Sequence, residues 1–117
     1  MSEFEEQALL IDWTNLNKQR YPDLDLIFAI PNAAKRTKTT RNKMLREGLK
    51  SGVPDLFLPV PKKPHHGLWI EMKFGKNKTT ANQDRWINRL QAKGYKVLIC
   101  YSGQEAISEI EKYLGIE

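Results

Sequence analysis

The spacing of apolar residues along the chain predicts four helices and four strands. A first helix is predicted over residues 3–19, where Leu9, Leu10, Trp13 and Leu16 recur at helical spacing before Pro22. Further helices are predicted over 38–49, from Thr79 or Thr80 to Lys93, and over about 103–114. Short apolar runs predict strands over 25–30, 55–60, 68–74 and 95–101. The order α-β-α-β-β-α-β-α indicates an α/β fold, a mixed β-sheet flanked by helices.

The segment 68–74 alternates in a way that gathers three side chains on one face. Its even-numbered positions are apolar, whereas the odd-numbered positions are Trp69, Glu71 and Lys73. Because successive side chains of a strand point to opposite faces, these three share a face. Asp55 opens the preceding strand, which we expect to pair with this one as a hairpin. That pairing would bring the Asp55 carboxylate close to Glu71.

Two carboxylates and a carbonyl, for which Met72 is well placed, are hard oxygen ligands that suit Mg²⁺ or Mn²⁺. Phosphodiester hydrolysis uses such an ion to neutralise developing charge and to activate water. Lys73 can orient or deprotonate that water. The pattern therefore indicates a metal-dependent hydrolytic centre. The alternative is a surface salt bridge between Glu71 and Lys73, which contributes little to stability, and the bare pattern alone favours that alternative.

Two further polar residues lie on apolar helix faces and strengthen the first interpretation. Glu6 precedes Leu9, Leu10 and Trp13 on the core-facing stripe, and Gln83 shares its helix face with Trp86 and Ile87. Buried polar groups need partners, so each residue either lines a cleft or reaches solvent from a helix end. Together with Asp55 and Glu71, these two residues make four polar side chains, from four separate elements, that we expect to point inward.

Charge is concentrated in one stretch of the 117-residue chain, whose formal net charge is +5. Residues 35–50 hold a single acid, Glu47, among the cations Lys35, Arg36, Lys38, Arg41, Lys43, Arg46 and Lys50. Such a stretch is typical of a phosphate-binding surface, although a solvated helix face has the same composition. The residues predicted to contact DNA phosphates are Asn32, Lys35, Arg36, Lys38 and Arg41.

Length and cysteine content narrow the class of protein. A chain of this length fits one domain over residues 1–117, and no apolar run is long enough for a membrane span. The lone Cys100 lies in an apolar run, which excludes a disulfide framework and a cysteine zinc site and favours the cytoplasm.

The motifs together resemble the VRR-NUC family of the PD-(D/E)XK nuclease superfamily, in particular its short stand-alone phage members. The resemblance runs from Glu6 to Tyr113 and rests on stretches that occur in the family's order: Ile30-Pro31-Asn32, Lys35-Arg36, Gly48 to Asp55, His66 to Lys73, the helix around Gln83, and Gly94 to Val97. The chain departs from the commoner form at Ala33-Ala34, where related proteins often have glycines.

The resemblance implies a restriction-endonuclease-like core and roles for particular residues. Asp55 and Glu71 match the metal-binding acids, Lys73 the catalytic lysine, and Gln83 the glutamine that supports the site. Glu6 matches the acid of the first helix, which assists catalysis and metal binding, with Glu3 or Glu5 as alternatives.

The same resemblance implies a Mg²⁺- or Mn²⁺-dependent DNA endonuclease that is selective for branched junctions or flaps. It further implies a homodimer in the cytoplasm of a bacterial or phage-infected cell. Two alternatives stay open: a non-catalytic DNA-binding or scaffolding module on the same fold, and a restriction or transposition enzyme of the same superfamily.

Overall fold

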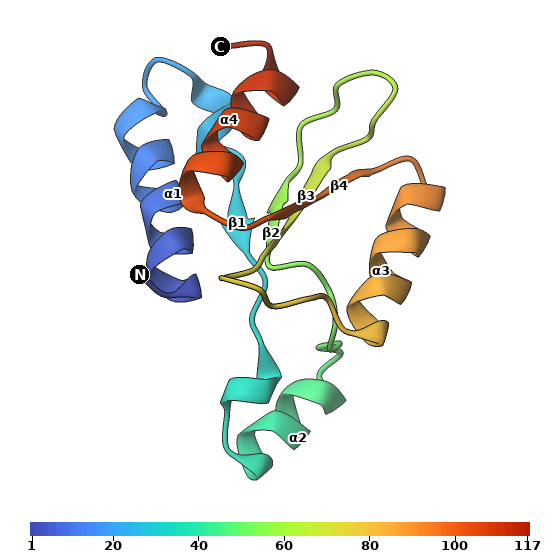
Figure 1. Cartoon of the computed structure of the whole chain (residues 1–117). Helices are drawn as coiled ribbons and strands as arrows, with labels where there is room; N and C mark the ends of the chain where they lie inside the picture. Colours follow the sequence, from blue (N-terminus) through green and yellow to red (C-terminus); the bar gives the residue numbers. More distant parts are fainter.

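A four-stranded mixed sheet in the order β1-β2-β3-β4 forms the centre of the computed structural model, which describes residues 1–117 (Figure 1). The strands are β1 (Phe28–Ala29), β2 (Leu56–Leu58), β3 (Leu68–Met72) and β4 (Lys96–Cys100). The pairs β1–β2 and β2–β3 are antiparallel, as expected of the predicted hairpin, whereas β3–β4 is parallel. The connection between the two parallel strands contains a helix, as the crossover between parallel strands usually does.

Helices cover both faces of the sheet. Helices α1 (Glu3–Asn17) and α4 (Gly103–Leu114) pack together on one side, and α3 (Ala81–Ala92) lies on the other side against β4 (Figure 1). Helix α2 (Lys38–Arg46) projects from the body, and no residue in it is buried. The predicted order of helices and strands is thus confirmed, and the protein has the expected mixed α/β fold.

The core lies between the sheet and the α1–α4 layer. Leu68, Ile70 and Met72, the even-numbered residues of β3, are all fully buried there with Leu56 and Leu58 of β2. Burying one such side chain stabilises the fold by roughly 2 kcal/mol. The alternation predicted for this segment is therefore confirmed, and it leaves Glu71 and Lys73 on the opposite face of β3.

The structure shortens several predicted elements. Residues 25–30 were expected to form a strand, but η1 (Pro22–Leu26) is a 3₁₀ helix and only Phe28–Ala29 pairs with β2. Pro22 favours this outcome because its fixed φ suits the first position of a helix. A second 3₁₀ turn, η2 (Ala33–Lys35), precedes α2. No helix is long and apolar enough to cross a membrane.

Candidate active site

Strand pairing holds Asp55 beside β3. Leu56 pairs with Ile70, so the next register position sets Asp55 opposite Glu71. The Asp55 Oδ2 atom accepts a hydrogen bond from the Met72 backbone N–H at 2.7 Å. On its other side, the Asp55 carbonyl accepts from the Ile30 N–H at 2.8 Å. Both neighbouring strands therefore fix the position of this carboxyl group.

The turn before Asp55 is held against α3 by a close approach at Gly52. This glycine has φ +88°, and a Cβ added there would lie 2.7 Å from the Asn82 amide nitrogen. The same Asn82 nitrogen donates to the Ser51 carbonyl at 2.9 Å and to its hydroxyl at 2.8 Å. Only glycine meets both the positive φ and the lack of space. The turn consequently fixes α3 relative to Asp55.

Glu71 lies beside three other predicted site residues, Asp55, Lys73 and Gln83. Its side chain is 2% exposed, and its Oε2 atom accepts from Gln83 Nε2 at 3.3 Å and lies 3.8 Å from Lys73 Nζ. Its second oxygen, Oε1, is buried without a hydrogen-bond partner. Lys73 is also buried, so the ion pair is not the surface salt bridge of the alternative interpretation. A buried carboxyl oxygen with no partner is costly, and a bound ligand is one way to satisfy it.

The electrostatics of the site favour an additional cation. Burial, and after it the nearby Asp55 charge, raise the pKa of Glu71 to about 8, although Lys73 acts in the opposite direction. Two neighbouring carboxyl groups cannot both ionise easily in a buried site without more positive charge. Lys73 alone does not supply enough positive charge, because the pKa of Glu71 remains raised.

Asp55 opens onto a cavity of about 360 Å³ between the first half of α1, the end of β1 and η2. The polar residues that line it are Glu3, Gln7, Asp12, Asn32, Lys35 and Asp55. Asn32 is fixed there because its Oδ1 atom accepts from the Ala34 N–H at 2.9 Å and caps η2. Two of the five predicted DNA contacts, Asn32 and Lys35, therefore lie at the same cavity as Asp55.

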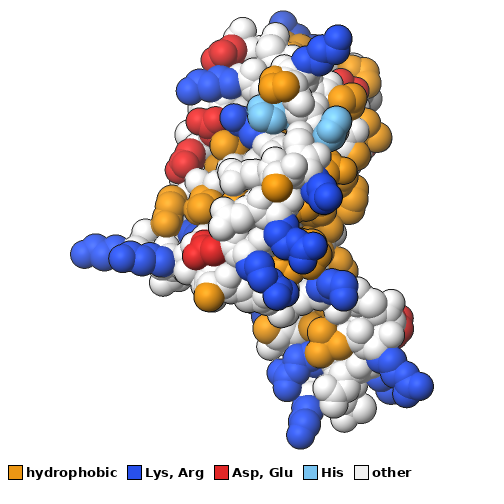
Figure 2. All heavy atoms as spheres, turned by 90° about the vertical axis from the view of Figure 1, so that its right-hand side faces the viewer, with side chains coloured by type: hydrophobic (Ala, Val, Ile, Leu, Met, Phe, Trp, Pro, Cys, Tyr) orange, Lys and Arg blue, Asp and Glu red, His pale blue; other side chains and the backbone are white.

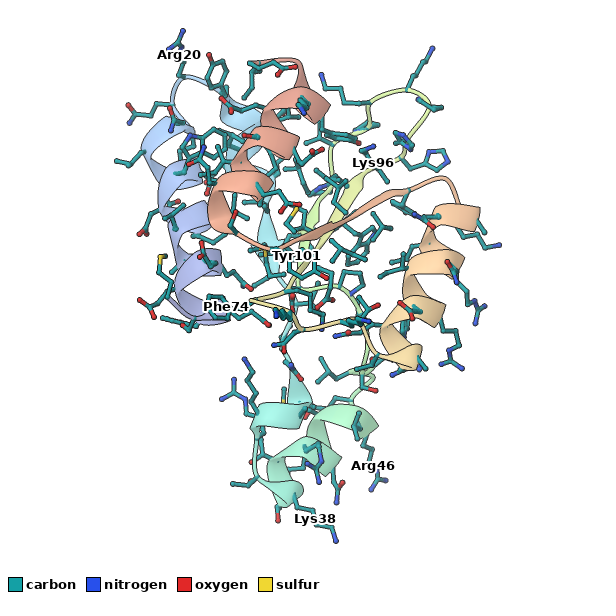
Figure 3. The ribbon with its side chains drawn as sticks, viewed as in Figure 1. Arg20, Lys38, Arg46, Phe74, Lys96 and Tyr101 are labelled. Carbon is teal, nitrogen blue, oxygen red and sulfur yellow. The ribbon has the colours of Figure 1, made fainter.

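The other three predicted DNA contacts lie further out. Arg36 follows η2, and Lys38 and Arg41 belong to α2. Figure 3 shows Lys38 and Arg46 on α2 pointing away from the sheet, whereas Phe74, which directly follows Lys73, lies close to the body of the protein. The structure thus separates the predicted phosphate contacts into a pair at the cavity and a group on the projecting segment.

The structure does not bring Glu6 to this cavity. Its Oε1 atom accepts from the Gly103 N–H at 3.0 Å and so caps the first turn of α4. Glu5 is used as well, since its carboxylate accepts from the Ser2 N–H in a capping box. Glu3, which the sequence left as an alternative, lines the cavity, and its charge contributes to the raised pKa of Glu71. Of the three acids in this segment, Glu3 is the one placed at the site.

The donors at the site fit a hard divalent ion coordinated largely by water and substrate. No group of three or more His, Cys, Asp or Glu side chains is arranged to hold a metal. Asp55 and Glu71 instead offer two carboxyl groups, one of them with an unpartnered buried oxygen. Mg²⁺ is commonly bound by one or two carboxylates and keeps several waters or substrate oxygens. The orphaned oxygen and the raised pKa therefore agree with such an ion.

Comparison with known proteins agrees with the fold described above. The VRR-NUC domain family matches residues 2–104 of the chain. A solved structure described as a VRR-NUC domain protein is 30% identical and superposes with a TM-score of 0.81. That match covers 99% of this chain and 90% of the other. No curated protein matches the sequence.

Proposed function

Because the chain belongs to the VRR-NUC family, whose domains are generally nucleases that use divalent metals, we propose that it is a Mg²⁺- or Mn²⁺-dependent DNA endonuclease. The observation that carries this proposal is the convergence of Asp55, Lys73 and Gln83 on the buried carboxyl group of Glu71. A purely structural ion pair would not require a second carboxyl group, nor an oxygen left without a partner.

Asp55 and Glu71 would hold the ion, with the Met72 carbonyl as a further donor. When bound, the ion supplies positive charge to the phosphate and lowers the pKa of a water molecule. The acid from α1 that assists them is Glu3 rather than Glu6, since Glu3 lines the cavity with Asp55 and its charge raises the pKa of Glu71, whereas Glu6 caps α4.

Gln83 and Lys73 prepare this pair of carboxyl groups in different ways. Gln83 is fixed from two sides: its Oε1 atom accepts from the Thr80 N–H at 2.9 Å, and its Nε2 atom donates to Glu71. This contact selects one orientation of the Glu71 carboxylate. Lys73 presents a buried ammonium beside the same oxygen and would hold the attacking water by a hydrogen bond. Both residues therefore prepare the site before the phosphodiester bond is cut.

The substrate would be held through its phosphates. Asn32 and Lys35 line the cavity with Asp55, and Arg36, Lys38 and Arg41 continue the basic surface toward α2. Contacts of this kind position DNA without reading its sequence. We extend the proposal to branched junctions or flaps and to a homodimer, because family membership supports both and two sites can then face two strands.

Cleavage of labelled single strand, duplex, flap and four-way junction, each in EDTA, Mg²⁺ and Mn²⁺, tests the proposal. We expect cutting only with metal, and its loss in Lys73→Ala, whereas the exposed Lys112→Ala serves as the matched control and should cut normally. Light scattering of the same samples measures the oligomeric state. Binding without cutting of any substrate would instead favour the non-catalytic DNA-binding module.

A further inference from the structure

Helix α3 carries a second group of basic side chains, separate from the cavity that contains Asp55. Arg85, Arg89 and Lys93 follow one another at intervals of four residues, which places them along one face of the helix. Lys50, from the segment after α2, joins them around a hollow of about 420 Å³. We call these four residues the α3 cation face. In Figure 2, which views this side of the molecule, Lys and Arg side chains continue down the middle of the surface onto α2.

The protein does not neutralise the positive charge of the α3 cation face. The remaining residues that line the hollow are Trp86 and Leu90, so no acid takes part. None of the four cations forms a salt bridge. The only acid of α3, Asp84, accepts a hydrogen bond from the Thr79 hydroxyl at 2.5 Å and does not line the hollow. Like charges gathered without counter-charges favour an anionic partner.

The α3 cation face is also fixed relative to the candidate catalytic residues. Asn82 binds Ser51, which holds the neighbouring Lys50 against the start of α3. One residue further, Gln83 contacts Glu71. From Gln83 to Lys93 the helix rises about 15 Å. One strand of B-form DNA covers that distance in about four nucleotides, at roughly 3.4 Å each.

We propose that the α3 cation face binds the sugar–phosphate backbone of the DNA substrate, away from the phosphate that is cut. The identity of the ligand rests on the proposed nuclease function, and the charge arrangement rests on the structure alone. Cations repeated along a helix match the repeated charges of a nucleic-acid strand, and Trp86 and Leu90 offer a small apolar floor for its sugars. An acidic protein would find too little apolar surface here for a stable interface.

The test is DNA binding by the full chain in EDTA, where no metal-dependent cutting takes place. Fluorescence anisotropy with a labelled duplex and a labelled four-way junction gives Kd at several salt concentrations. For Arg85→Ala/Arg89→Ala we expect Kd to rise about tenfold near 0.1 M salt. The slope of log K against log salt should become shallower by about 1.8 for the duplex, because each lost phosphate contact accounts for about 0.9.

Two further variants separate a specific site from general charge effects. Lys62→Ala/Lys63→Ala removes the same charge from an exposed loop at the end of the molecule opposite α2 (Figure 1), and its Kd and slope should stay close to wild type. Arg85→Lys/Arg89→Lys keeps the charge and should keep the slope. Arg85 and Arg89 are exposed helix residues, so alanine preserves the fold there, which melting curves verify.

The outcomes distinguish this inference from the nuclease proposal. An unchanged Kd and slope in Arg85→Ala/Arg89→Ala would overturn the inference, even if the wild-type protein cuts DNA. Equal losses in the Lys62→Ala/Lys63→Ala control would overturn it too. Conversely, if the wild-type protein binds but never cuts, a selective loss in Arg85→Ala/Arg89→Ala still supports the α3 cation face.

Discussion

Replacing Glu71 by glutamine should stabilise the metal-free protein at neutral pH, although this residue belongs to the candidate active site. The ordinary pKa of the carboxyl group is 4.5, and in the folded protein burial and the nearby Asp55 charge together raise it to about 8. Glutamine resembles the protonated form in size and charge and has no proton to lose. The substitution therefore removes the energetic cost of protonating this carboxyl group when the protein folds at neutral pH.

The sign and size of the effect follow from proton linkage. Because the folded-state pKa is raised, the protonated carboxyl contributes stability that is fully present below about pH 4.5. That contribution is lost as the pH rises through about 8. Between these values the folded state binds one more proton than the unfolded state, so unfolding becomes easier by about 1.4 kcal/mol per pH unit. From pH 5 to 7.5 the wild type should lose about 3 kcal/mol relative to Glu71→Gln, a large share of the total stability of roughly 5–15 kcal/mol.

The assay is urea unfolding in EDTA at several pH values for wild type, Glu71→Gln and Glu47→Gln. The last variant removes an exposed carboxyl group of the projecting segment and should unfold in parallel with wild type. Adding Mg²⁺ at pH 7.5 should stabilise wild type and leave Glu71→Gln nearly unchanged, because a ligand stabilises only the state that binds it. Parallel curves for wild type and Glu71→Gln from pH 5 to 7.5 would refute the reasoning.

Three further predictions concern individual side chains. Gln83→Glu keeps the acceptor that caps α3 but replaces the donor to Glu71 by a third carboxylate beside Asp55 and Glu71. Mg²⁺-dependent cleavage should therefore fall at least tenfold, while the melting temperature changes little. Near-normal cleavage would show that the 3.3 Å contact is dispensable. Glu6→Ala should destabilise the protein by about 1–2 kcal/mol through the unsatisfied Gly103 N–H, as measured by urea unfolding, whereas Glu3→Gln should lower the cleavage rate without that loss. The reverse pattern would return the catalytic role to Glu6. Tyr113→Phe removes the 2.6 Å hydrogen bond to the Val60 carbonyl and should cost about 1 kcal/mol in the same unfolding assay, with cleavage unchanged.

Periodicity in the sequence was sufficient to place the residues of β3. Alternation assigns Glu71 and Lys73 to the face opposite Leu68 and Ile70, and this assignment needs only the local pattern. The position of Asp55 requires the hairpin pairing as well, which the short Pro-rich connection to β3 favours. The alternation and the hairpin pairing depend only on residues close together in sequence, and the structure contains both.

Periodicity could not decide between Glu3 and Glu6. The two acids lie one helical turn apart, so they occupy nearly the same stripe of α1. What separates them is the docking of α4, whose Gly103 approaches the Glu6 carbonyl so closely that a Cβ would lie 2.5 Å from it. That contact joins residues 97 positions apart in sequence. A pattern within one helix carries no information about such a contact.

The positions of the candidate site differ in how firmly the fold holds them, and this difference has a functional meaning. Asp55 is bonded to β1 and β3, and Glu71 is buried, so the carboxyl groups are fixed by the sheet. Helix α2 instead buries no residue and packs mainly against η2. Substitutions of Lys38 or Arg46 therefore remove charge without removing packing. They should alter DNA affinity while leaving stability nearly unchanged, because substrate contact and fold stability depend on separate sets of residues.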